Sequence, residues 1–350
     1  MPSVLADDLD AVISATESLW NEVRGARIFV TGGTGWFGCW FLESFAWANR
    51  HLALKAEMTV LSRDPSALQE KAPHLASDSA VRFHVGDVRS FQFPSGGFSH
   101  VIHAATAADT RLNDERPELM LETIVSGTAR TIQFAKQAGA RKFLLTSSGA
   151  VYGKQPADMT HIPETYSGAP DPLDPKSAYA TGKRNSELQC VIAARYGSIE
   201  AKIARCFAFV GPYMRFDAHF AIGNFIGDQL RGRPIVIKGD GSTVRSYLYM
   251  SDLMIWLWTI LFRGANCKAY NVGSEEAYTT KNLAQAVAGS LEPHVAVKIE
   301  GKPSGAPVDR YVPSTARARA ELGLKQAVSL EEAIRKTASW GSRNRSSALA

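Results

Sequence analysis

Three side chains able to take part in proton transfer lie in two short segments near the middle of the chain. Tyr179 and Lys183 stand four residues apart in YATGK, and Ser148 belongs to LLTSSGAVYG. Residues four apart share one helix face, so the Lys183 ammonium is expected beside the Tyr179 phenol, where it lowers the phenol pKa. Such a tyrosine can exchange a proton with a hydroxyl or carbonyl group, and Ser148, just beyond a predicted strand, could hydrogen-bond the same oxygen. The set suits hydride exchange between a nicotinamide and a carbonyl carbon.

A glycine-rich turn upstream gives this set its context. TGGTGWFG places Gly32, Gly35 and Gly38 directly after the apolar run 28–30. Glycines there let the backbone turn tightly, bring its N–H groups against a pyrophosphate and pack the next helix on the sheet. A tight turn without a ligand would also select glycine, and a tyrosine and lysine at this spacing are more often surface residues. Their order and context favour a dinucleotide site followed by a catalytic pair.

Short apolar, β-branched runs alternate with helical stretches from residue 26 to about residue 150. The runs are RIFVTGG, EMTVLSR, VRFHVGD, HVIHAA and RKFLLTSS. This alternation predicts an α/β fold with a doubly wound parallel sheet covered on both faces. Residues 1–25 are expected to form a preceding amphipathic helix, and the polar segment 339–350 to be a disordered tail. The apolar face of the first helix is expected to include Leu9, Val12, Ile13 and Leu19.

The end of the second predicted strand bears on the choice of cofactor. Ser62 and Arg63 stand where the adenosine ribose of a dinucleotide would lie. An acidic residue there would bind a ribose hydroxyl, whereas Ser62 and Arg63 would accept a 2′-phosphate, so the sequence favours NADP, with NAD as the alternative. Arg63 could equally be a solvated loop charge, and Asp64 could still turn toward a ribose. Asp87, after the third strand, is placed to hydrogen-bond an adenine edge, or simply ends that strand in a turn.

Composition narrows the class of protein. The chain has 350 residues, 45% hydrophobic and 21% charged, with a net charge of +5. Its basic residues are scattered among 34 acidic ones, which argues against nucleic acid and for an acidic small-molecule substrate. Four cysteines stand far apart without metal-ligand spacing, so we expect free thiols and no metal site. The N-terminus is acidic and the apolar stretch 253–262 is too short to span a membrane, which predicts a cytoplasmic location.

The motifs together resemble those of a known family. TGGTGWFG, GDV, HAA, SSGAVYG, YATGK and VGP look like the extended short-chain dehydrogenase/reductase family, in particular its NAD-dependent epimerase/dehydratase group. The resemblance covers about residues 26–330. It implies a Rossmann domain over 26–205 that carries the catalytic set, and an interleaved, smaller substrate-binding domain that is mainly 206–338. It also implies a nucleotide-linked sugar as substrate.

The same resemblance implies roles for individual residues. Tyr179 is expected to be the catalytic acid or base, Lys183 its partner and a nicotinamide-ribose ligand, and Ser148 the second hydroxyl, which also contacts the substrate. Arg245, Arg310 and, more weakly, Asn224 are expected to bind the substrate diphosphate, since guanidinium groups match its charge and geometry. Both arginines could instead form surface salt bridges. Besides Gly32, Gly35, Ser62, Arg63 and Asp87, the expected cofactor contacts are Thr34, Trp36, Phe37, Val88, Ala104 and Ala105.

Departures from the family pattern narrow the chemistry. Gly149 and Ala150 stand where the family's 4,6-dehydratases carry Asp-Glu and its UDP-glucuronate decarboxylases usually keep the Glu, so elimination lacks its acid and base. The segment resembles that of 4-epimerases, and a 4-keto reductase that uses NADPH needs nothing more. Ile124 stands where an asparagine usually braces a helix near the active site, and Ala208 stands where an asparagine commonly contacts the sugar or the cofactor. A non-catalytic dinucleotide sensor would usually lack the tyrosine or the lysine, and an enzyme acting on a carbonyl compound without a nucleotide would not need Arg245 and Arg310.

The resemblance also suggests an oligomeric state. In many relatives, the helix that bears the catalytic tyrosine and the helix preceding it form a four-helix contact between two subunits. Leu188, Val191 and Ile192 would allow such a homodimer here, although they could equally face their own sheet.

Overall fold

The computed structural model describes residues 5–106, 110–218, 220–303, 305 and 307–348. The chain divides into two compact units. The first comprises 1–153, 168–206 and 254–270, and the second comprises 154–167, 207–253 and 271–350. We expected an interleaved chain with the main boundary after residue 205. The segments 154–167 and 254–270 are the ones that cross over.

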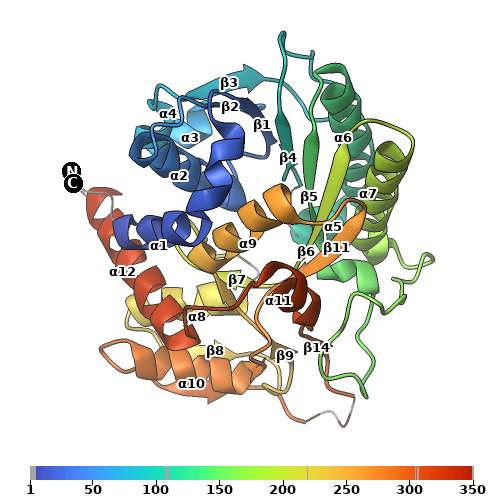
Figure 1. The fold of residues 1–350 in the computed structure, drawn as a ribbon. Coiled ribbons are helices and arrows are strands. Elements are labelled where there is room, and N and C mark those ends of the chain that lie inside the picture. The colour runs from blue at the N-terminus through green and yellow to red at the C-terminus, as the bar shows by residue number, and fades with distance from the viewer. Residues whose placement is uncertain (1–4, 107–109, 219, 304, 306, 349–350) are drawn as a thin grey trace. The chain divides into compact units, whose positions relative to one another are not determined.

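A seven-stranded sheet in the order β11-β6-β5-β4-β1-β2-β3 forms the centre of the first unit (Figure 1). The pairings that join β3, β2, β1, β4, β5 and β6 are all parallel. The strands are β1 Arg27–Thr31, β2 Glu57–Ser62, β3 Val81–Val85, β4 His100–His103, β5 Lys142–Ser148, β6 Glu200–Cys206 and β11 Lys268–Val272. The predicted Rossmann fold is confirmed, and the five strands predicted from apolar runs are β1 to β5.

Helices cover both faces of this sheet, with α1 to α4 on one side and α6 and α7 on the other (Figure 1). The helices are α1 Ala6–Thr16, α2 Trp36–His51, α3 Ser66–Lys71, α4 Pro73–Ala76, α5 Thr110–Glu115, α6 Pro117–Gln137, α7 Ala178–Arg195 and α9 Met250–Arg263. The 3₁₀ turns η1 Glu17–Val23, η2 Gly149–Tyr152 and η3 Pro175–Ser177 complete the set. Phe29 of β1 packs in the core against Phe91, Phe98 and Phe134, with ring centroids 4.4–5.6 Å apart.

The predicted N-terminal helix is present but shorter than expected. It ends at Thr16, and the chain continues as the 3₁₀ turn η1. Leu9, Val12 and Leu19 are buried, whereas Ile13 is half-buried. Trp20, fully buried, lies 4.6 Å from the Trp258 ring of α9. Trp20 of this 3₁₀ turn thus belongs to the apolar layer, although it was not among the residues predicted for the apolar face.

The second unit has small sheets flanked by helices. Its strand orders are β10-β7, β12-β9-β14 and β13-β8. The elements are β7 Phe209–Val210, α8 Ala221–Leu230, β8 Ile235–Ile237, β9 Val244–Arg245, β10 Leu248–Tyr249, β12 Tyr278–Thr279, α10 Thr280–Ser290, β13 Val297–Ile299, β14 Arg310–Tyr311, α11 Ala316–Leu322 and α12 Leu330–Ala348. None of the helices that the structure describes is long and apolar enough to cross a membrane.

Helix α12 extends into the segment 339–350, for which the sequence predicts a disordered tail. The helix continues through this segment to Ala348, and the last two residues lie outside the described chain. The start of this segment is packed: the Trp340 ring lies 5.1 Å from the Tyr213 ring, and a Cβ atom at Gly341 would come within 2.5 Å of the Phe216 ring. These contacts add burial to a segment whose polar composition suggested none.

Candidate active site

The glycine turn lies between β1 and α2, as the sequence predicts. Gly32 has a φ of +74°, and a Cβ atom there would come within 2.6 Å of the Ala104 carbonyl oxygen. Gly38 packs against the turn so closely that a Cβ atom would overlap the Gly32 and Gly33 backbone. Side chains are therefore excluded at Gly32 by conformation and at both positions by space. Gly35 is the N-cap of α2 and provides no side-chain cap.

This geometry fits a dinucleotide. The strand order reverses between β1 and β4, and ligands of such sheets bind beyond the carboxyl ends of the strands at this point. The N-terminus of α2 meets the same edge, where its backbone N–H groups and dipole favour a pyrophosphate. Thr34, Trp36 and Phe37 belong to the turn and the first turn of α2, and Ala104 and Ala105 follow β4. The predicted cofactor residues at this edge thus come from two adjacent strand ends.

The predicted catalytic residues are brought together in the first unit. Ser148 is the last residue of β5, and its side chain is hydrogen-bonded to the Tyr179 phenol. Lys183, one turn after Tyr179 on α7, has its Nζ 5.9 Å from the centroid of the Tyr179 ring. That ammonium donates to the Thr146 carbonyl oxygen at 2.8 Å and to Thr106 Oγ1 at 2.9 Å. The arrangement places a phenol, a hydroxyl and an ammonium at the carboxyl edge of the sheet.

The pKa values of this set differ from the expectation. Burial raises the pKa of the Tyr179 phenol, although the hydrogen bond with Ser148 opposes this shift. Burial also lowers the pKa of Lys183 to about 8. The sequence suggested that the ammonium would lower the tyrosine pKa. In the structure, desolvation sets the direction of the Tyr179 shift, and the opposing contribution comes from Ser148.

A buried polar chain behind these residues was not predicted. His103 of β4 is hydrogen-bonded to Thr31 Oγ1 at 2.8 Å and to Thr128 Oγ1 at 3.1 Å. Thr128 of α6 in turn contacts Ser186 Oγ of α7 at 2.7 Å. Burial lowers the His103 pKa to about 3, so the imidazole is neutral and bridges the two strands to the two helices. The HAA motif marked His103, but its partners are distant in sequence.

The end of β2 carries the residues expected to choose the cofactor. Ser62 is buried and accepts a hydrogen bond from the Asp64 backbone N–H, while Arg63 is exposed. Asp64 Oδ1 accepts hydrogen bonds from the Ser66 N–H and hydroxyl at the start of α3. Its carboxylate is therefore engaged locally. Lys71 at the end of α3, which sequence reasoning missed, donates to the Thr34 carbonyl oxygen at 2.9 Å.

Asp87 follows β3 and is held by Arg89. The Arg89 guanidinium donates to both carboxylate oxygens, at 2.9 and 3.1 Å, which lowers the Asp87 pKa. The charge of Arg63 acts in the same direction. Val88 packs against Gly127 of α6, where a Cβ atom would come within 2.9 Å of Val88 Cγ1. An adenine would thus meet a carboxylate that already has a guanidinium partner.

The two arginines expected to share a diphosphate lie on adjacent short strands of the second unit. Arg245 of β9 pairs in register with Tyr311 of β14, and Arg310 pairs with Val244. Neighbouring positions of a strand point to opposite faces, so this register separates Arg245 from Arg310. Arg245 also forms an ion pair with Asp309 at 2.6 Å. The register therefore places the two side chains on opposite faces of this small sheet.

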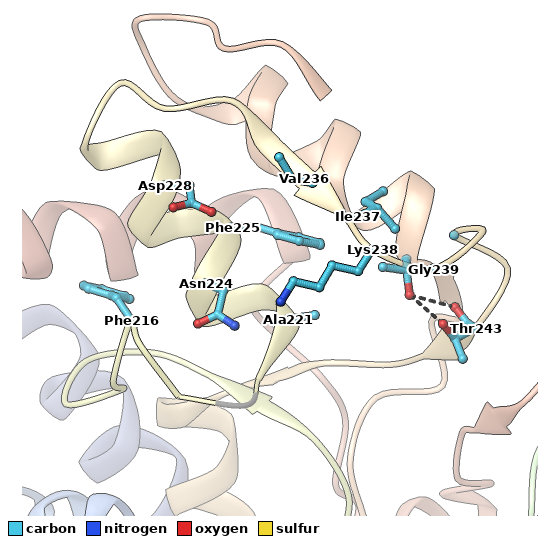
Figure 2. A pocket seen from close by; sticks show the side chains of 12 residues that line it. Phe216, Ala221, Asn224, Phe225, Asp228, Val236, Ile237, Lys238, Gly239 and Thr243 are labelled. Carbon is cyan, nitrogen blue, oxygen red and sulfur yellow. Dashed lines mark hydrogen bonds between the residues drawn. The ribbon is translucent and has the colours of Figure 1, made fainter. Parts of the chain in front are cut away.

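Asn224 lines a pocket of about 460 Å³ in the second unit (Figure 2). Phe216 and Phe225 give it aromatic walls, and Figure 2 shows the Lys238 side chain extended toward Asn224. The Thr243 and Thr280 hydroxyls, 2.9 Å apart, close one end. Aromatic rings with a few amide and charged groups suit a flat polar heterocycle. Sequence reasoning found Asn224 but not Lys238, because pocket walls come from separate segments.

All four cysteines are free thiols, as expected. Cys206, the last residue of β6, is buried, and burial raises its pKa to about 12. Among the residues that the structure describes, no three His, Cys, Asp or Glu side chains are grouped to hold a metal ion.

Comparison with known proteins identifies the family. The NAD dependent epimerase/dehydratase family profile matches residues 28–273. The chain belongs to this family. That match spans the glycine turn, the catalytic set and the pocket residues from Asn224 to Thr243. The predicted membership of the extended short-chain dehydrogenase/reductase family is confirmed.

Proteins named for different activities are similar to this chain. UDP-glucuronic acid decarboxylase 3 of Arabidopsis thaliana is 32% identical over 309 residues, which is 88% of this chain and 86% of that protein. The structure of DesIV, a dTDP-glucose 4,6-dehydratase of Streptomyces venezuelae with NAD bound, is 25% identical, with a TM-score of 0.75 over 91% of this chain and 98% of that one. UDP-glucose 4-epimerase of Thermotoga maritima, 21% identical with a TM-score of 0.76, covers 91% of this chain and 99% of its own and shares the fold. This chain is an enzyme of a family that acts on nucleotide sugars and binds NAD(P).

Proposed function

We propose that this enzyme is an NAD(P)-dependent epimerase or oxidoreductase that acts by hydride transfer at one carbon, C4 by preference, of a nucleotide-activated sugar. The observation that carries the proposal is the set of buried Ser148, half-buried Tyr179 and buried Lys183, with Gly149 and Ala150 of η2 directly after Ser148. The set can move a proton to or from one oxygen. Gly149 and Ala150, directly after Ser148, carry no carboxyl group that could remove a second proton, from carbon.

Each residue has a definite part in this chemistry. A bound nicotinamide supplies or accepts the hydride. Tyr179 exchanges the proton of the reacting oxygen, and the Ser148 hydroxyl holds that oxygen through a hydrogen bond. The Lys183 ammonium, fixed by Thr106 and the Thr146 carbonyl, holds the nicotinamide ribose and stabilises a Tyr179 phenolate as it forms.

The absence of a carboxyl group after Ser148 separates the candidate reactions. A 4,6-dehydratase needs an acid and a base for loss of water, and the neighbouring positions provide neither. The similarity to UDP-glucuronic acid decarboxylases extends over most of the chain but does not restore a glutamate at residue 150. The second candidate is an NADPH-dependent 4-keto-sugar reductase, which needs only the three residues present.

Two cations support NADP as the cofactor. Arg63 is exposed at the end of β2, and Lys71 contacts the backbone of the glycine turn. Asp64, which follows Arg63 in the chain, is engaged with Ser66 and is thereby held away from the role of a ribose ligand. NAD remains the alternative, which an epimerase would retain and recycle.

The pocket lined by Asn224, Phe225 and Lys238 is proposed to hold the nucleotide part of the substrate. An aromatic ring can stack against Phe225, while the amide and the ammonium supply donors to its oxygens. Arg245 and Arg310 remain predicted diphosphate ligands. Because the register separates them, we expect their individual contributions to differ, with Arg245 released from Asp309 on binding.

The decisive experiment identifies the retained cofactor and the product. Small molecules released on denaturation are analysed by mass spectrometry. The native enzyme is then incubated with UDP-glucose, UDP-galactose, UDP-glucuronate or, together with NADPH, a 4-keto nucleotide sugar, and the products are identified by NMR. Interconversion of a C4 epimer pair with stoichiometric retained dinucleotide supports the epimerase. NADPH consumption with a 4-keto nucleotide sugar alone supports the reductase. Release of carbon dioxide from UDP-glucuronate would contradict both.

A further inference from the structure

Glu187 lies one helical turn beyond Lys183 on α7 and is almost buried, with 12% of its side chain exposed. Its carboxylate accepts a hydrogen bond from Ser147 Oγ at 2.5 Å. It also forms a two-pronged ion pair with Arg205, with N–O distances of 2.7 and 3.0 Å. Arg205 NH1 donates to the Tyr152 hydroxyl at 2.9 Å. One carboxylate therefore organises a buried group of four side chains.

These contacts join the elements that present the catalytic set. Ser147 immediately precedes Ser148 on β5, and Arg205 is the penultimate residue of β6. Tyr152 ends η2, the turn that follows Ser148. A carboxylate shared by these groups fixes the end of β5 relative to α7, and with it the distance between Ser148 and Tyr179.

The ionisable groups around Lys183 suggest a second role for the Glu187 carboxylate. The titratable groups that face the ammonium are Tyr179, Glu187 and Cys190 on α7, Cys206 on β6 and His103 on β4. Burial raises the pKa values of the phenol and of both thiols and lowers that of His103, so these four groups are neutral near pH 7. Glu187 is the carboxylate of the group, and its charge raises the Lys183 pKa against the effect of burial.

We propose that Glu187 is a positioning residue of the catalytic set, which holds the end of β5 against α7 and compensates the charge of the buried Lys183 ammonium. This inference rests on the proposed function, in which Lys183 contacts the cofactor. A buried ion pair with a purely structural role would stabilise the fold without any effect on the titration of Lys183. The pH dependence of cofactor binding distinguishes the two roles.

The test measures the affinity of the full chain for NADH and for NADPH. Binding is monitored by the fluorescence of the dinucleotide, from pH 6 to 10 at constant ionic strength. Loss of the ammonium weakens binding, so the wild-type affinity is expected to fall as the pH rises through about 8. Glu187→Gln is expected to move this midpoint down by about one pH unit. Glu187→Asp keeps the charge, so its midpoint is expected to lie close to that of the wild type.

Two control variants separate charge from packing. Ser147→Ala removes one hydrogen bond and keeps the carboxylate, so the midpoint is expected to stay in place. Glu200→Gln makes the same charge change at the exposed start of β6 and is also expected to leave it unmoved. Because Glu187→Gln leaves Arg205 without its partner, Glu187→Gln/Arg205→Gln provides a neutral pair in case the single variant does not fold. Its midpoint is expected to shift in the same downward direction.

A midpoint that is unchanged in the single or the double variant, or that moves equally in Ser147→Ala, would overturn the inference. The proposed function would then still stand, because the wild type binds a dinucleotide. Failure of the wild type to bind NADH and NADPH at any pH would overturn the proposed function and this inference with it.

Discussion

Gly182 of α7 lies directly against Ile124 of α6, so that a Cβ atom at Gly182 would come within 3.2 Å of three Ile124 side-chain carbons. Gly182 stands between Tyr179 and Lys183, and Ile124 is buried. The distance between the two helices at this point therefore sets the position of the catalytic helix on the sheet. The asparagine expected at residue 124 from the family would have used polar contacts, whereas here close apolar packing does the bracing.

Gly182→Ala is expected to lower turnover by about 10-fold or more, because a small displacement of Tyr179 misplaces the reacting atoms. Alanine favours a helix by about 1 kcal/mol over glycine. This gain offsets the steric cost of the contact with Ile124, so the melting temperature is expected to change little. The variant Gly182→Ala/Ile124→Val, which removes one methyl group from the contact, is expected to recover part of the activity. Equal losses in the two variants would show that this contact does not set the geometry.

Tyr179→Phe is expected to reduce turnover by about 10² to 10⁴-fold while dinucleotide affinity is largely kept, because only the proton-transfer group is removed. Ser148→Ala is expected to have a smaller effect of the same kind. Tyr196→Phe, at the exposed end of the same helix, is the matched control. Steady-state kinetics and fluorescence titration with NADPH measure the two quantities, and an active Tyr179→Phe enzyme would remove Tyr179 from the mechanism.

Arg63→Ala and Lys71→Ala are each expected to weaken NADPH binding by about 10- to 100-fold, because each variant removes a hydrogen-bond donor to the charged 2′-phosphate. NADH binding is expected to be nearly unchanged, because NADH lacks the 2′-phosphate. Arg50→Ala serves as the control. It removes an exposed cation near the C-terminal end of α2, away from the glycine turn, where Arg50 pairs with Asp78. Equal affinity of the wild type for both dinucleotides would contradict the NADP preference.

Stability is expected to fall in acid because of a buried group at the amino ends of β4 and β5. His100 is hydrogen-bonded to Glu22, which also pairs with Lys142 at 2.8 Å. Burial lowers the His100 pKa from its ordinary value of 6.5, so below pH 6.5 the unfolded chain takes up a proton that the folded chain does not. Contacts with Lys142 and His100 outweigh burial and lower the Glu22 pKa, which adds a loss below about pH 4.5.

His100→Gln is expected to show a smaller drop in melting temperature between pH 7.5 and pH 5.5 than the wild type, although its stability at pH 7.5 is lower. Thermal unfolding followed by circular dichroism measures both. His51→Gln, on an exposed side chain of α2, controls for the loss of a histidine. Parallel pH dependence in the wild type and His100→Gln would assign the acid effect to other groups.

Local patterns predicted the frame of the site, because each strand run and the Tyr179–Lys183 spacing depend on residues close in sequence. Contacts between distant segments were not accessible in this way. His103 finds Thr31 and Thr128, and Glu187 finds Ser147 and Arg205, only after the sheet order is known.

The direction of the Tyr179 pKa shift also could not be predicted from the sequence. The spacing predicts a neighbouring charge but does not reveal how deeply both groups are buried, and burial determines the direction of the shift. The register of Arg245 and Arg310 and the contact of Trp340 with Tyr213 are likewise consequences of pairing between distant segments.

The enzyme is expected to be a homodimer through α6 and α7. Leu188 and Ile192, one turn apart on α7, are 57% and 49% exposed, and Ile192 lines a shallow depression between the two helices. Covering such an apolar surface with the same helices of a second copy removes it from water. Leu188→Glu/Ile192→Glu is expected to convert the dimer to a monomer in light scattering, whereas Leu173→Glu, on an exposed loop residue, leaves it intact. A monomeric wild type at micromolar concentration would contradict this assembly.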